Sequence, residues 1–268
     1  MSQACITIKK MTMAYGDFII QRDLDFKINQ GDIFVIMGGS GCGKSTLMMH
    51  LIGMIAPSKG SIHYGNENLW GSNASNQRLL LNKTGVLFQS GALLSSMTLG
   101  ENIALPISEH TELNKKNIQE IVDYKLSLVG LSGFSDFYPS EISGGMQKRA
   151  GLARAMALDP EILFFDEPSA GLDPISSKLL DDLILSLRDN LNATIVMVTH
   201  ELASIFAIGS NSIFLDPESK TMIAEGDPKK LLKKGVLIHK PETCYFSYNT
   251  LNYILKHNLF LLMILIAH

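Results

Sequence analysis

Residues 38–45 of the chain, GGSGCGKS, combine glycines, a lysine and a serine in a spacing suited to phosphate binding. Glycines let the backbone wrap with its N–H groups aimed inward at phosphate oxygens, and the positive end of a following helix adds to the attraction. Lys44 is expected to reach the β and γ phosphates of a nucleotide, and the Ser45 hydroxyl to bind Mg²⁺. The predicted phosphate-binding residues are Gly38, Gly39, Ser40, Gly41, Cys42, Gly43, Lys44, Ser45 and Thr46.

Two adjacent carboxylates, Asp166 and Glu167, follow the apolar run ILFF at residues 162–165. A strand buried on both faces delivers its last residues to the sheet edge where ligands bind. We therefore expect Asp166 to reach the Mg²⁺ shell and Glu167 to be the general base for an attacking water. The alternative is an acidic pair that only caps the next turn.

Four further residues have two interpretations each. Gln89 closes the strand VLFQ and is expected to touch Mg²⁺ or the attacking water, unless it is an ordinary polar strand end. His200 follows the apolar run TIVMVT and either contacts the γ phosphate or is a surface histidine. Tyr15 either stacks on adenine or packs in a core. Cys42 is either a thiol whose pKa the anion site lowers or, more simply, a small packing residue.

The elements that must position these residues alternate between strands and helices. Short strands are expected at ITI, DFII, LDFKI and DIFVIM within residues 4–37, and at SIHY and TGVLFQ within residues 61–89, with a polar segment between the last two. Helical spacing replaces the strand signal from about residue 93 to 140, which predicts an inserted helical subdomain. A helix, an apolar strand, a second helix and another strand then follow. This alternation predicts an α/β fold whose parallel sheet is covered by helices.

Composition restricts the class of protein. With 268 residues and a net charge of −3, the chain gives no electrostatic case for nucleic-acid binding. Three widely spaced cysteines indicate neither a disulfide framework nor a zinc site, so a reducing cytosol is expected. The N-terminus lacks the layout of a signal peptide, and no apolar run reaches the ~18 to 20 residues that span a bilayer. The tail 241–268 is left with two interpretations, a segment that packs on a partner or an altered form of the natural end.

A second glycine-rich turn, formed by Ser143, Gly144 and Gly145, precedes a predicted helix. Alone it is a weak signal, because two glycines before a helix are usually a flexible turn. It completes an ordered set that resembles the motifs of ABC-type ATPases over about residues 4–235, namely residues 38–45, Gln89, residues 143–145, Asp166 with Glu167, residues 169–173 and His200.

The resemblance implies a shared site. In that family two copies pack head to tail, so the signature turn of residues 143–145 closes over the ATP held by the phosphate loop of the other copy, with residues 169–173 between them. It also implies the P-loop NTPase fold of an ABC ATPase over residues 1–240, with a parallel-sheet core, an antiparallel β subdomain and the inserted helical subdomain. The expected reaction is Mg²⁺-dependent ATP hydrolysis.

Two residues differ from the usual signature of the family and indicate a smaller subgroup within it. Ile142 stands where the usual signature has Leu, and Met146 where it has Gln. The sequence SGGM followed by a basic pair, together with residues 88–111, resembles the ATPases of the Mla and Mce phospholipid-transport systems. This implies a homodimer held peripherally on the cytoplasmic face of the bacterial inner membrane. Its implied partners are an integral-membrane permease, an MCE-domain protein and a small STAS-domain subunit.

Two other functions stay open at this point, and a third is excluded. The catalytic motifs equally suit an importer of amino acids, metals or another small solute. A soluble ABC-type ATPase of translation or DNA repair fits less well, because such proteins carry two ATPase units or long coiled coils. A non-catalytic structural member would lack Lys44 or Glu167, and both are present.

Overall fold

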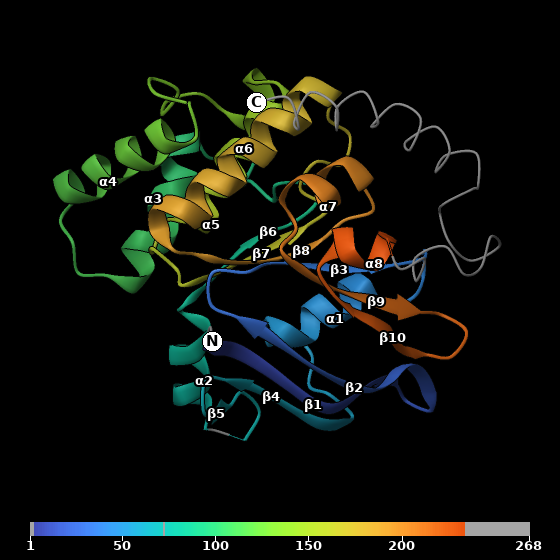
Figure 1. Ribbon diagram of the computed structural model, residues 1–268. Helices are drawn as coiled ribbons and strands as arrows, with labels where there is room; N and C mark the ends of the chain where they lie inside the picture. The colour runs from blue at the N-terminus through green and yellow to red at the C-terminus, as the bar shows by residue number, and fades with distance from the viewer. Residues whose placement is uncertain (1–2, 72, 234–268) are drawn as a thin grey trace.

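The computed structural model describes residues 3–71 and 73–233, and within them the strands form two β-sheets (Figure 1). The predicted boundary at residue 240 and the tail 241–268 lie outside the described residues. An antiparallel four-stranded sheet has the order β2-β1-β4-β5, with bounds β1 Ala4–Tyr15, β2 Phe18–Asn29, β4 Lys59–Tyr64 and β5 Glu67–Asn68. A six-stranded sheet has the order β10-β9-β3-β8-β7-β6, with bounds β3 Ile33–Gly38, β6 Thr84–Leu87, β7 Ile162–Asp166, β8 Thr194–Val198, β9 Asn211–Asp216 and β10 Thr221–Gly226.

The six-stranded sheet is parallel except for β10, which pairs antiparallel with β9. Its central strands are buried on both faces, and alternate residues enter two separate cores. Phe34 and Ile36 of β3 lie in one core with the antiparallel sheet, whereas Val35 and Met37 lie in the other with the helices. The carboxyl ends of the parallel strands therefore form a single edge, as the sequence predicts.

The helices divide between these two cores (Figure 1). Helix α1 (Lys44–Leu51) lies between the two sheets and contributes Leu47 and Leu51 to the first core. The opposite face of the six-stranded sheet carries α3 (Leu99–His110), α4 (Lys115–Leu128), α5 (Gly144–Ala155), α6 (Pro174–Leu191), α7 (Leu202–Ile208) and α8 (Pro228–Lys233). Among residues 3–71 and 73–233, no helix has both the length and the apolar character needed to span a bilayer.

The inserted helical segment begins with a well-defined cap. The Thr98 side chain accepts a hydrogen bond from the Glu101 N–H, and the Glu101 carboxylate accepts one from the Thr98 N–H. This reciprocal capping satisfies two donors that the start of α3 would otherwise leave open. Asn114 is the N-cap of α4, and its side chain accepts a hydrogen bond from the Asn117 N–H.

Several elements differ from the sequence prediction. The runs DFII and LDFKI form one strand, β2, in which Asp23 adopts a positive φ of 52°. The polar segment after β5 contains a helix, α2 (Ala74–Leu81), whose N-cap Asn73 accepts from the Asn76 N–H at 2.9 Å. A short 3-10 helix (Pro139–Glu141) precedes the signature turn. Strands β9 and β10 and helices α7 and α8 were not predicted.

Candidate active site

The phosphate loop connects β3 to α1 with backbone angles that require glycine. Gly38, Gly41 and Gly43 have φ values of 149°, 74° and 96°. A Cβ on Gly38 would lie 2.5 Å from both the Cys42 Sγ and the Leu215 carbonyl oxygen. Gly38 therefore has no room for a side chain, and at Gly41 and Gly43 the positive φ disfavours one. Ser40 is exposed and Thr46 lies in the first turn of α1, whose N-cap Gly43 offers no side-chain cap to the helix N–H groups.

Lys44 folds back across the loop. Its Nζ donates to the carbonyl oxygens of Gly38 and Gly39, each at 3.0 Å. The loop is supported from behind by Gln21 of β2, which is fully buried and donates to the Cys42 carbonyl oxygen at 2.8 Å. Cys42 itself is buried, and that burial raises the pKa of its thiol. The structure therefore contradicts the interpretation of Cys42 as a low-pKa thiol and agrees with a packing role.

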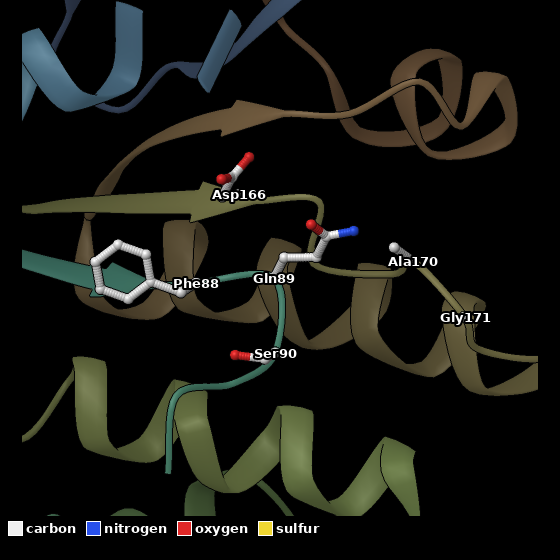
Figure 2. A pocket seen from close by; sticks show the side chains of 6 residues that line it. All are labelled: Phe88, Gln89, Ser90, Asp166, Ala170 and Gly171. Carbon is white, nitrogen blue, oxygen red and sulfur yellow. The ribbon is translucent and has the colours of Figure 1, made fainter. Parts of the chain in front are cut away.

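Asp166 and Gln89 both lie at the carboxyl edge of the sheet (Figure 2). They lie on a cavity of about 540 Å³ lined by Phe88, Gln89, Ser90, Asp166, Ala170 and Gly171. The Ser45 hydroxyl donates to Asp166 Oδ1 at 3.3 Å, which joins the phosphate loop to the end of β7. Burial raises the pKa of Asp166, and the charge of Glu167 adds to that effect, while the Ser45 hydrogen bond and Lys44 oppose it.

The donor set fits Mg²⁺. This ion prefers oxygen ligands and is commonly held by one or two carboxylates together with substrate phosphates. Ser45 and Asp166 supply a hydroxyl and a carboxylate already in contact, and the Gln89 side chain reaches the same cavity (Figure 2).

Glu167 directly follows β7 in a left-handed conformation with φ of 48°. Its N–H donates to the Val198 carbonyl oxygen of β8 at 2.8 Å, and its side chain is 14% exposed. His200 Nδ1 lies 2.8 Å from Glu167 Oε2, although the imidazole is 54% exposed. Sequence reasoning placed both residues at this edge but did not predict that they touch.

The signature turn lies elsewhere in the chain. Ser143 caps α5, and its Oγ accepts from the Met146 N–H at 3.3 Å. Ser143 and Gly144 are exposed, and a Cβ added to Gly144 would meet nothing within 4 Å. Because α5 packs in the core opposite to that of α1, the structure does not bring this turn into the cavity around Asp166.

Two remaining predictions concern the periphery of the site. Tyr15 ends β1 beside the Gly16 turn and is 55% exposed, so it is not a core residue and its ring is open to a ligand. In the segment 169–173, Ser169 is buried whereas Gly171 is exposed. Sequence reasoning missed Gln21 and the buried Lys148 of α5, because neither forms part of a phosphate-binding or acid–base pattern.

The sequence of this chain matches the model of a known protein family. Residues 21–170, more than half of the chain, match the ABC transporter family model. The chain belongs to the ABC transporter family. It is therefore an ABC ATPase.

Curated relatives of this ABC ATPase include transport subunits from several bacteria. The chain is 40% identical to the intermembrane phospholipid transport system ATP-binding protein MlaF of Haemophilus influenzae, over 87% of this chain and 88% of that protein. It is 37% identical to the Escherichia coli K12 protein of the same name, over 84% and 83% of the two chains. A probable ribonucleotide transport ATP-binding protein, mkl of Mycobacterium leprae, is 43% identical over 74% of this chain but only 57% of that protein.

Solved structures have the same fold. The cbiO1 subunit of the cbiONQ transporter from Clostridium perfringens has a TM-score of 0.79 and 24% identity, covering 90% of this chain and 97% of that one. The dimeric structure of MJ0796, a bacterial ABC transporter cassette, has a TM-score of 0.75 and 26% identity, covering 83% and 98%. The mixed sheets and helices of this chain are thus the ABC ATPase fold.

Proposed function

We propose that this ATPase drives phospholipid transport between the inner and outer membranes and so maintains lipid asymmetry. The observation that carries the proposal is the likeness to the two MlaF proteins, which extends over more than four fifths of both chains in each comparison. The mkl relative has a different printed substrate, and this chain spans little more than half of its length. Transport of a ribonucleotide or another small solute is therefore the second candidate.

The proposed assembly has two copies of this chain on the cytoplasmic face of the inner membrane, bound to an integral-membrane permease. An MCE-domain protein and a small STAS-domain subunit complete the proposed complex. The two-copy arrangement is supported by the exposed Ser143 and Gly144, which cap a helix on the far side of the sheet from α1. A helix N-terminus with open space attracts an anion, and a γ phosphate approached from a second subunit supplies one.

The proposed chemistry is phosphoryl transfer from ATP to water. Lys44 would exchange its bonds to the Gly38 and Gly39 carbonyls for phosphate oxygens, and Tyr15 would stack on adenine. Ser45, Asp166 and Gln89 would hold Mg²⁺, which when bound offsets the charge of the β and γ phosphates.

Glu167 would accept the proton of the attacking water as general base. His200 holds the Glu167 carboxylate at 2.8 Å and would report the γ phosphate from the same position. Ser143 of the partner subunit, with the glycine N–H groups beside it, would close the phosphate cage.

The catalytic assignment is tested with Glu167→Gln, which keeps the shape of the side chain but removes its basicity. We expect turnover to fall by about 10²- to 10⁴-fold while ATP binding persists and a closed dimer accumulates. Glu161→Gln is a matched control, because Glu161 precedes the same strand at its opposite end. An E167Q chain that still hydrolyses ATP at the wild-type rate would remove Glu167 as the base.

The transport assignment is tested by affinity purification of the tagged chain from membranes in mild detergent, with mass spectrometry of co-purifying proteins and lipids. A polytopic permease, an MCE-domain protein and bound phospholipid are the expected result. A solute-type permease without lipid would preserve the ATPase assignment and overturn the proposed substrate. A chain that never associates with membranes would refute the transporter proposal.

A further inference from the structure

Lys148 is a buried cation whose partners are backbone carbonyls. It lies one turn into α5, the helix that the signature turn begins, and is 8% exposed. Its Nζ donates to the carbonyl oxygen of Gln89 and lies 3.4 Å from that of Glu167. Among the described residues, no carboxylate lies within ion-pairing distance of this ammonium. A buried lysine with such partners is costly and calls for a reason.

The two carbonyls lie where the parallel ladder between β6 and β7 ends. Leu87 of β6 pairs with Phe165 of β7, and Gln89 and Glu167 stand two residues beyond them on their respective chains. The strands separate there, because the chain turns toward Ser90 on one side and toward Ala170 on the other (Figure 2). Beyond the last paired residues, the Lys148 ammonium joins the two strand ends by hydrogen bonds to their carbonyl oxygens.

The contact at Glu167 bears on its side-chain direction. Its left-handed φ of 48° is an uncommon state for a non-glycine residue and has to be held by its surroundings. The Glu167 N–H is fixed by Val198, and its carbonyl oxygen accepts from the Ala170 N–H at 3.1 Å in addition to Lys148. A shift of the ammonium would therefore re-aim the carboxylate.

The contact at Gln89 belongs to a longer seam along one face of α5. Gly151, three residues after Lys148, packs so closely that an added Cβ would lie 2.9 Å from the Gly91 carbonyl oxygen. Arg154, three residues further, donates through Nη1 to the Ala92 carbonyl oxygen at 2.5 Å. Lys148, Gly151 and Arg154 follow one another at steps of three residues along one side of α5, and the segment 89–92 is packed along that side.

We propose that Lys148 is a positioning residue that couples the signature turn of a chain to the catalytic residues of the same chain. When residues 143–145 shift to meet the partner's ATP, α5 moves, and Lys148 transmits that movement to the backbone of Gln89 and Glu167. Each chain would then align its own water-activating groups only while its signature turn is engaged. The inference rests on the proposed roles of Gln89 and Glu167.

The electrostatic surroundings suit this role. Burial lowers the pKa of Lys148, and the charges of Glu167, Asp166 and Glu201 act in the opposite direction. The ammonium therefore lies in the field of Glu167, whose carbonyl oxygen it contacts, and of Asp166 and Glu201, without forming a direct ion pair with any of the three.

The test compares full-length Lys148→Met, Lys148→Arg and Arg149→Gln chains as dimers saturated with Mg²⁺ and ATP. Turnover is expressed per bound nucleotide, so that unfolded chains do not count. We expect K148M to lose about 10- to 100-fold in kcat, because misplacing reacting groups by about 1 Å has effects of that size. We expect KM for ATP to stay within about threefold, because the phosphate loop is untouched.

Two variants separate positioning from a merely structural role. K148R keeps donors for both carbonyls and should recover kcat to within about threefold of the wild type. R149Q, which removes the bonds from Arg149 to the carbonyls of Val129 and Gly130, should keep the wild-type kcat. A K148M chain with wild-type kcat, or K148M and R149Q chains with equal losses, would overturn the inference. If E167Q also remained active, the proposed function would fail instead.

Discussion

The buried Asp181 should make the stability of this ATPase fall as pH rises. Asp181 lies on α6, is 8% exposed, and its Oδ2 accepts from Ser204 Oγ of α7 at 2.8 Å. Burial raises the pKa of this carboxyl from 3.8 to about 6, the charges of Glu201 and Asp182 add to the rise, and the Ser204 hydrogen bond opposes it. The perturbation that tests this is Asp181→Asn, which keeps an oxygen acceptor for Ser204 and cannot ionise.

The magnitude follows from the difference between the two pKa values. Between pH 3.8 and pH 6 the unfolded chain releases the Asp181 proton while the folded chain retains it, so the free energy of unfolding decreases as pH rises. A pKa difference of about two units lowers the free energy of unfolding by at most about 3 kcal/mol, and this full decrease is reached by pH 7.5. At pH 5 the penalty is about 1 to 2 kcal/mol, and well below pH 4 it disappears.

The assay is urea unfolding of the wild type and the D181N chain at pH 5 and pH 7.5. The stability advantage of D181N over the wild type should grow by about 1 to 2 kcal/mol between these pH values, while other titrating groups cancel in the difference. An exposed aspartate elsewhere in the chain gives the control, because for Asp136→Asn the same difference should change by less than about half a kcal/mol. An advantage for D181N that is independent of pH would refute the reasoning.

Two further substitutions test the half sites separately. Gly38→Ala should weaken ATP binding by at least about tenfold and lower the free energy of unfolding by about 1 to 3 kcal/mol, because its Cβ would lie 2.5 Å from a fixed carbonyl oxygen. Nucleotide titration and thermal unfolding measure the two effects, and normal values for both would contradict the loop geometry. Ser143→Arg should reduce hydrolysis by about 10²-fold or more while ATP affinity of the monomer stays within about threefold. Full ATPase activity of S143R dimers would rule out a shared site.

The parts of the candidate site that could be predicted from the sequence are those that depend on residue type and local spacing alone. The glycines of residues 38–43 and the carboxylates after ILFF are of this kind, because loop winding and strand ends follow from local pattern. The prediction that Lys44 binds the ATP of its own chain while Ser143 contacts the ATP of the other copy came from the family resemblance and not from the local sequence pattern. The parallel sheet was predictable because its strands are apolar throughout.

The residues that sequence reasoning missed depend on tertiary contacts. Lys148 reads as an ordinary cation of an amphipathic helix, and only the fold shows that its ammonium enters the gap between two strand ends. Gln21 is likewise a polar residue in an unremarkable strand until β2 passes behind the phosphate loop. Helix α2 was missed because its polar composition hides the cap at Asn73. The contact between His200 and Glu167 requires β8 beside β7, which local pattern does not specify.

The placement of α1 and α5 on opposite faces of the sheet has a genetic consequence. In the proposed head-to-tail dimer, each chain lends its phosphate loop to one catalytic site and its signature turn to the other. A chain carrying Lys44→Ala and a chain carrying Ser143→Arg would each form homodimers in which both sites are damaged. In the mixed dimer both lesions fall in the same site, and the second site is assembled entirely from intact parts. That second site belongs to the chain whose own signature turn carries Ser143→Arg, so under the Lys148 coupling two such alleles should fail to complement one another in a cell that expresses both.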